Sequence, residues 1–196
     1  MKSTVQRARL KTHLVLIMTA TLSSTLLASD NEKMEIYAGG HSWSTVNSTG
    51  NGTTIRLNRD VLRGFGVGIP LNEQFTLNGE FLFGDPSTTI TPGSNVTADM
   101  MMFDMNIDYK IRERKWSGGH LAPYITAGIG TMNFNQDVLG GIDEWDLSYN
   151  AGVGLYWDTD SEVFLKLAYR LIWVDMDVTN KSELFDGVSF AIGLSF

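Results

Sequence analysis

Strict alternation of large apolar and small side chains marks the last ten residues, and it constrains the fold more than any other feature. Residues 187–196 read GVSFAIGLSF. One parity carries only large apolar side chains: Val188, Phe190, Ile192, Leu194 and Phe196. The other parity carries Gly, Ser and Ala. Because successive side chains of a β-strand point to opposite faces, the segment is predicted to be a strand with one fully apolar face.

The chain from residue 34 onward repeats this pattern, and no helical period is sustained over a useful length. We predict eight strands, at 34–44, 61–69, 75–84, 98–110, 121–134, 145–157, 162–174 and 185–196. The fifth strand is the least regular, because Met132 and Phe134 break its alternation, and a β-bulge is expected there. The expected fold class is all-β, an eight-stranded antiparallel up-and-down barrel.

The connections between these strands alternate in length. Long polar loops are expected at 45–60, at 85–97, from the end of the fifth strand to about 144, and at about 175–184. Short turns are expected at 70–74, 111–120 and 158–161. This alternation is typical of outer-membrane barrels, in which long loops are extracellular and short turns and both termini are periplasmic.

The first 29 residues have the composition of a secretory signal peptide. Four basic residues, Lys2, Arg7, Arg9 and Lys11, precede an apolar run at 13–28 that is rich in Ser and Thr in its second half. This run is too short for a membrane helix, so we expect cleavage after Ala28 or Ser29, with a signal peptide at 1–28 and a barrel domain at 29–196. The chain has no cysteine, which excludes disulfides and a lipoprotein anchor. Loss of residues 1–28 changes the formal charge from −7 to −11, which argues against nucleic-acid binding.

Two observations favour a membrane barrel over a soluble barrel with an apolar interior. The polar face of the strands is dominated by small residues, which suits the narrow lumen of an eight-stranded barrel better than a solvated exterior. Aromatic residues also bracket the apolar faces. Trp145 and Trp157 lie twelve residues apart on one face, which is roughly 28 Å along the membrane normal for a strand tilted by ~45°. An aromatic girdle is predicted at Trp145, Trp157, Tyr109, Tyr169 and Trp173.

The closing strand and the stretch GFGVGIPLNEQFTLNGE at residues 64–80 resemble the small eight-stranded outer-membrane barrels, such as the OmpA transmembrane domain, OmpX and NspA. The resemblance implies a transmembrane barrel in the outer membrane of a Gram-negative bacterium. It also implies that the barrel-assembly machinery recognises Phe190, Ile192, Leu194 and Phe196 as an assembly signal. Expected partners are outer-membrane lipid and lipopolysaccharide, that machinery, periplasmic chaperones, and a host or surface ligand of the loops.

Charged residues on the polar face are the first functional candidates: Glu35, Glu80, Asp104, Asp108, Lys166 and Arg170. An isolated charge in the lumen is costly unless it is paired. The family resembled closes its lumen with such a salt-bridge network, and we predict Glu80 and Arg170 to form one pair. A small ion-conducting pore is the alternative interpretation of the same charges.

A lipid A-modifying enzyme is a second alternative, based on His41 and Ser42 near the outer end of the first strand. Adjacent strand residues face opposite sides, so no catalytic constellation is predicted. Neither a cofactor nor a metal site is expected. The basic residues Arg112, Arg114 and Lys115, with Lys110, fall at a periplasmic turn, where they either meet anionic lipid headgroups or are simply hydrated. The expected function is non-enzymatic: a structural, envelope-integrity or surface-interaction role through four extracellular loops.

Overall fold

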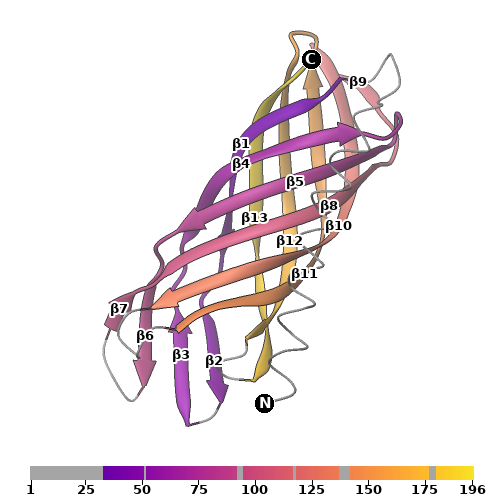
Figure 1. Cartoon of the computed structure of the whole chain (residues 1–196). Coiled ribbons are helices and arrows are strands. Elements are labelled where there is room, and N and C mark those ends of the chain that lie inside the picture. The colour runs from indigo at the N-terminus through magenta and orange to yellow at the C-terminus, as the bar shows by residue number, and fades with distance from the viewer. Residues whose placement is uncertain (1–32, 51, 92–94, 117, 137–141, 177–179) are drawn as a thin grey trace. The chain divides into compact units, whose positions relative to one another are not determined.

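The computed structural model describes residues 33–50, 52–91, 95–116, 118–136, 142–176 and 180–196. The predicted signal peptide lies outside these residues. The segment Lys33–Phe196 forms one compact unit. Its strands fall into a barrel and a smaller sheet (Figure 1).

Eight antiparallel strands close the barrel, which confirms the predicted fold class. They are β1 (Glu35–Trp43), β4 (Val61–Pro70), β5 (Phe75–Gly84), β8 (Asp99–Lys110), β10 (Gly119–Gln136), β11 (Ile142–Thr159), β12 (Val163–Met176) and β13 (Lys181–Ser195). Each strand pairs with the next one in this order. The last strand, β13, pairs with β1 over nine residue pairs, from Glu35↔Ser195 to Trp43↔Gly187. Two backbone hydrogen bonds between Met34 and Phe196, of 2.9 and 3.0 Å, complete this seam.

Four short strands form a second sheet where the sequence predicts two long loops. They are β2 (Val46–Gly50), β3 (Thr53–Leu57), β6 (Ser87–Thr91) and β7 (Asn95–Thr97), in the order β2-β3-β6-β7. We call this the cap sheet. It lies at the end of the barrel opposite to the C-terminus (Figure 1), and these two ends are called the cap end and the terminal end. One more strand, β9 (Arg114–Trp116), pairs with the start of β10 at the terminal end.

The third and fourth predicted loops are wrong in extent. Strands β10 and β11 pair as far as Gln136↔Ile142, and β12 and β13 pair as far as Met176↔Lys181. Only residues 137–141 and 177–180 connect them. The polar sequence of these segments reflects strands that continue past the apolar band, where the outward face no longer has to be hydrophobic.

The predicted bulge near Met132 and Phe134 is also wrong. The register of β10 is unbroken on both sides, against β8 from Tyr124↔Lys110 to Asn135↔Asp99 and against β11 along its whole length. Both side chains point inward and are buried. The alternation of apolar and polar residues fails at Met132 and Phe134 because the interior of the barrel is itself apolar near the cap end of β10.

The two faces of the barrel have opposite character. Large apolar side chains are exposed on the outside of every barrel strand, among them Ile36, Phe65, Phe83, Ile107, Ile125, Val153, Leu167 and Ile192. Towards the terminal end the interior holds charged and polar side chains beside a small buried cluster of Tyr37, Tyr124, Tyr156, Phe164 and Ala168. Towards the cap end it is a hydrophobic core. Among the residues that the structure describes, no helix has the length and hydropathy needed to cross a membrane.

Candidate functional site

The lumen charges come from opposite walls of the barrel. Lys166 and Arg170 are four residues apart on β12, so both side chains point inward, one above the other. Glu80 lies on β5, which is four strands away from β12 in either direction around the ring. The long cationic side chains therefore cross the lumen to reach carboxylates on the far wall.

Arg170 holds two carboxylates together. Its Nη1 lies 2.6 Å from Oε2 of Glu80, and its Nη2 lies 2.9 Å from Oδ2 of Asp104. The Tyr37 hydroxyl donates to Glu80 Oε1 at 3.2 Å, and the Asn106 amide donates to Glu80 Oε2 at 3.1 Å. Charge-assisted bonds of this length are the stronger class of hydrogen bond. The pair predicted from the sequence, Glu80 and Arg170, is thus in direct contact, with Asp104 as a third member.

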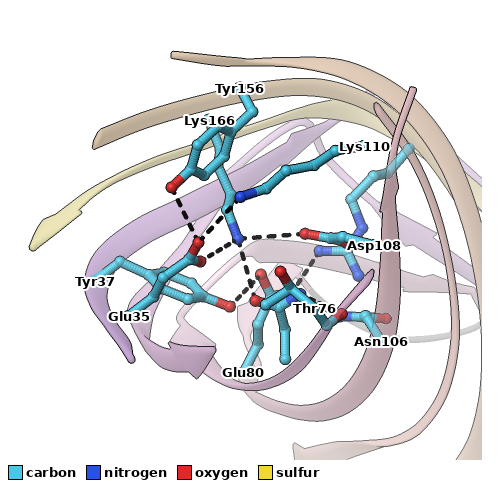
Figure 2. A network of polar contacts seen from close by, with 11 residues as sticks. Glu35, Tyr37, Thr76, Glu80, Asn106, Asp108, Lys110, Tyr156 and Lys166 are labelled. Atoms are coloured by element: carbon cyan, nitrogen blue, oxygen red, sulfur yellow. Dashed lines mark hydrogen bonds and ion pairs between the residues drawn. The ribbon is translucent and has the colours of Figure 1, made fainter. Parts of the chain in front are cut away.

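Lys166 forms a second cluster closer to the terminal end (Figure 2). Its Nζ lies 2.8 Å from Oε2 of Glu35 and 3.2 Å from Oδ2 of Asp108, and it donates to Oδ1 of Asn78 at 3.1 Å. The Tyr156 hydroxyl donates to Oε1 of Glu35 at 3.0 Å. The ammonium group is therefore surrounded by acceptors from three walls, which offsets the cost of its burial.

Lys110 is also a member of the network. In the sequence interpretation it is grouped instead with the basic residues of the turn that follows β8. Its Nζ lies 3.8 Å from Oε1 of Glu35 and 3.9 Å from the centre of the Tyr156 ring. The sequence pattern could have identified it, because Lys110 has the same parity as Asp104 and Asp108 and therefore shares the inward face of β8. With Lys110 included, three cations face four carboxylates.

A hydrophobic core closes the lumen beyond Arg170, and sequence reasoning missed it. It contains Trp43, Leu62, Leu82, Ala98, Met100, Met102, Met132, Phe134, Ile172, Val174, Met176 and Phe185, together with Val46, Ile55 and Leu57 of the cap sheet. Ion pairs thus cross the lumen at one height, and apolar side chains pack in it at another. A cavity of about 30 Å³, lined in part by Glu80, Lys166 and Arg170, has room for only one or two water molecules.

The aromatic residues predicted as a girdle all point outward. Tyr109 and Trp157 lie towards the terminal end, where they pair with Ile125 and with Leu121 and Leu165. Trp145 and Trp173 lie nearer the cap end of β11 and β12. Tyr169 lies at the middle of β12, opposite Val188 at the middle of β13, so its predicted place in a girdle is wrong. The apolar surface between the two groups has the arrangement of a lipid-facing band.

His41 and Ser42 are not brought together. His41 points into the lumen, is 1% exposed, and has its Nδ1 2.9 Å from the hydroxyl of Ser189 on β13. Ser42 takes the opposite, outward face of β1. His120, the other histidine of the described residues, lies 3.8 Å from the carboxylate of Glu113 at the terminal end. In the described residues, His41 thus contacts the hydroxyl of Ser189 and not that of Ser42, and His120 contacts a carboxylate.

The residues of the expected assembly signal lie on the outward face of the seam strand. Phe190, Ile192 and Leu194 point away from the lumen on β13, and each pairs with residues of β1 and β12. Phe196 follows at the end of the strand and is also exposed. Their side chains are therefore free of contacts in the lumen.

Comparisons with known proteins agree on the architecture. Residues 14–196 match the family model described as "Outer membrane protein beta-barrel domain". The chain is similar to Neisserial surface protein A from Neisseria, with 12% identity and a TM-score of 0.58 over 83% of this chain and 97% of that chain. It is similar to outer membrane protein OprG from Pseudomonas aeruginosa, with 12% identity and a TM-score of 0.59 over 86% and 98% of the two chains.

The N-terminal β-barrel domain of OprF from Pseudomonas aeruginosa gives 16% identity and a TM-score of 0.56, over 83% of this chain and 98% of that chain. No curated protein sequence matches the chain. At these identities the likenesses show the fold alone.

Proposed function

The chain belongs to the outer membrane protein β-barrel domain family, and on this premise we propose that it is a non-enzymatic membrane anchor that presents its cap sheet outside the cell. Family membership implies an outer-membrane location. In such barrels the termini are periplasmic, so the terminal end faces the periplasm and the cap end faces the exterior. The role is structural or adhesive, through contacts of the cap sheet with the environment.

The observation that carries the proposal is the double closure of the lumen. Arg170 and Lys166 bind carboxylates across the barrel, and the hydrophobic core fills the space between them and the cap sheet. An interior of this kind stabilises a scaffold and offers no route for hydrated ions. What is left to meet other molecules is the outward face of the cap sheet, which carries Asn47, Thr49 and Arg56.

Export and assembly form part of the same proposal. Residues 1–28 act as a cleaved signal peptide, and periplasmic chaperones carry the chain to the barrel-assembly machinery, which reads the strand ending at Phe196. Lipopolysaccharide and phospholipid surround the finished barrel. A host or surface ligand of the cap sheet is the remaining proposed partner.

The orientation is tested by labelling with a membrane-impermeant maleimide, because the chain contains no cysteine. Arg56→Cys, on the exposed face of the cap sheet, should react on intact cells. Lys115→Cys, in the exposed strand β9 at the terminal end, should react only after the outer membrane is permeabilised. Labelling of Lys115→Cys on intact cells would contradict the proposed orientation.

The closed lumen is tested by planar-bilayer recording of the purified protein. We expect no steady conductance from the wild type. A variant that combines Arg170→Gly and Lys166→Gly with alanine in place of the core residues Trp43, Phe134 and Phe185 is designed to weaken both closures and serves as the control. Steady conductance of the wild type would favour the pore alternative.

The enzyme alternative is tested by mass spectrometry of lipid A from otherwise identical cells with and without the protein. We expect identical spectra, because His41 is buried in the lumen and Ser42 faces away from it. A mass difference of one acyl chain, abolished by His41→Ala, would contradict the non-enzymatic role.

A further inference from the structure

A basic and aromatic corner projects from the terminal end of the barrel. After β8 ends at Lys110, the chain turns and β9 folds back onto the first residues of β10, with Arg114 opposite Leu121 and Trp116 opposite Gly119. In Figure 1 β9 lies beside the C-terminus, at the opposite end from the cap sheet. This places the corner at the periplasmic edge in the proposed orientation.

Strand pairing decides which of these side chains point outward. Ala122 and Tyr124 of β10 are buried in the lumen, so Leu121 takes the outward face. Directly opposed residues of an antiparallel pair share a face, and Arg114 and Trp116 therefore point outward with Leu121. Lys115 lies opposite His120 and takes the other face. The side chains of Arg114 and Lys115 therefore point to opposite faces.

The outward side of this corner combines exposed apolar and cationic groups. Trp116 is 62% exposed and Ile111 is 47% exposed, directly beyond the girdle residues Tyr109 and Trp157. The ideal Cβ position at Gly119 lies 2.9 Å from Nε1 of Trp157, so the tryptophan ring of the girdle adjoins β10 at the residue that pairs with Trp116. The aromatic band therefore continues onto this corner.

Positive charge is concentrated here. Arg112, Arg114 and Lys115 are exposed, and none forms an ion pair with another residue in the described part of the chain. The one carboxylate between Lys110 and Trp116, that of Glu113, faces His120 at 3.8 Å. Asp158 lies opposite His120 on β11, and the Asp160 N–H donates to the Gly118 carbonyl at 3.2 Å. The turns at 71–74 and 160–162 carry acidic residues and no basic ones. A ligand of this corner must be negatively charged and must tolerate contact with an indole ring.

We propose that Arg112, Arg114 and Trp116 form a headgroup site for an anionic phospholipid of the periplasmic leaflet. The guanidinium groups bind the headgroup phosphate, for which their planar donor geometry is suited. The indole ring of Trp116 lies at the level of the headgroups, where tryptophan is enriched in membrane proteins. The site selects one class of lipid and fixes the height of the barrel in the membrane.

Lipid binding is measured by native mass spectrometry of the detergent-solubilised protein, titrated with phosphatidylglycerol or with phosphatidylethanolamine. We expect the wild type to retain phosphatidylglycerol preferentially. Arg114→Gln should lower its apparent affinity by about fivefold, the equivalent of ~1 kcal/mol per basic residue at a membrane surface, and Trp116→Ala should also weaken it. Lys115→Gln makes the same change in charge on the other face and should leave the affinity unchanged.

Heat-dependent mobility in gels verifies that each variant is folded before it is titrated. If Arg114→Gln and Lys115→Gln lowered the affinity for phosphatidylglycerol equally, the lipid would be held by general electrostatic attraction, and the proposed site would be wrong. Equal retention of both lipids by the wild type would overturn the selectivity. The maleimide experiment tests the orientation separately, so a wrong orientation is distinguished from a wrong site.

Discussion

At the scale of single residues, Arg170 is the side chain on which the lumen depends most. Arg170→Met leaves Glu80 and Asp104 facing each other without a counter-charge, and loss of one partner of a buried ion pair costs about 3–5 kcal/mol. We expect the free energy of unfolding, measured by denaturant titration in lipid vesicles, to fall by that amount. Arg170→Lys should lose less, because one of the two contacts survives.

Neutralising the carboxylates provides the control for this variant. Glu80→Gln together with Asp104→Asn in the Arg170→Met background removes the unpaired charges and should recover most of the loss. An Arg170→Met protein as stable as the wild type would show that the ion pairs are not important for the fold.

A second residue-scale prediction concerns two glycines on neighbouring strands. A Cβ added at Gly64 would overlap the backbone oxygen of Phe81, whereas a Cβ added at Gly79 would meet nothing within 4 Å. Gly64→Ala should therefore destabilise the barrel by about 1–3 kcal/mol, as overpacking does. Gly79→Ala should stay within about 0.5 kcal/mol of the wild type. Folding yield and denaturant midpoint measured side by side check the difference, and equal values would contradict it.

The residues of the network were predictable from the sequence only in part. Charge and parity alone pick out Glu35, Glu80, Arg170 and the other ionic members, because a charge on the inner face has to be paired. The neutral members, such as Asn78 and Tyr156, are not predictable in this way. Their role depends on which heights of opposite walls coincide, and this is set by the stagger of strands around the closed ring.

At the scale of elements, the cap sheet is held by its buried face. Ile55 is 1% exposed and belongs to the hydrophobic core, while its neighbour Arg56 is exposed on the other face. Ile55→Ala should cost about 2–5 kcal/mol, as expected for removal of a buried aliphatic side chain. Arg56→Ala should cost little. We expect faster proteolysis within residues 45–60 for Ile55→Ala only, measured on barrels in vesicles, and equal rates would contradict the packing of the cap sheet on the core.

The barrel strands were predictable and the cap sheet was not, for one physical reason. Lipid requires an apolar outward face on every barrel strand, and this produces the alternation seen from Val188 to Phe196. Outside the lipid that requirement ends. The sequences of β2, β3, β6 and β7 are therefore rich in Ser, Thr and Asn, and their pattern cannot be told apart from that of a loop. The same change of surroundings explains why Met132 and Phe134 suggest a bulge in a strand whose register is regular.

At the scale of the whole molecule, the seam between β1 and β13 links the end of the chain to its assembly. The Phe196 side chain is exposed, while its backbone pairs with Met34. Phe196→Ser should therefore refold in detergent almost as well as the wild type, because the backbone pairing is kept. Its amount in the outer membrane should fall severalfold if the assembly machinery reads this residue.

Val188→Ser is the matched control for this prediction, since it changes an exposed apolar residue on the same strand away from the chain end. It should reach the membrane at nearly the wild-type level. Equal membrane levels of both variants, quantified by immunoblotting of membrane fractions, would mean that the terminal aromatic residue is not a signal.

The height of strands β10 and β11, which pair with each other along 18 residues, has a consequence at the cell surface. At ~3.3 Å per residue and a tilt of about 45°, such strands rise roughly 42 Å, against an apolar band of about 25 Å. In the orientation proposed above, we expect the cap sheet to stand among the sugars of the lipopolysaccharide. We then expect antibodies and phage to reach it more readily on cells with truncated polysaccharide chains than on cells with long ones.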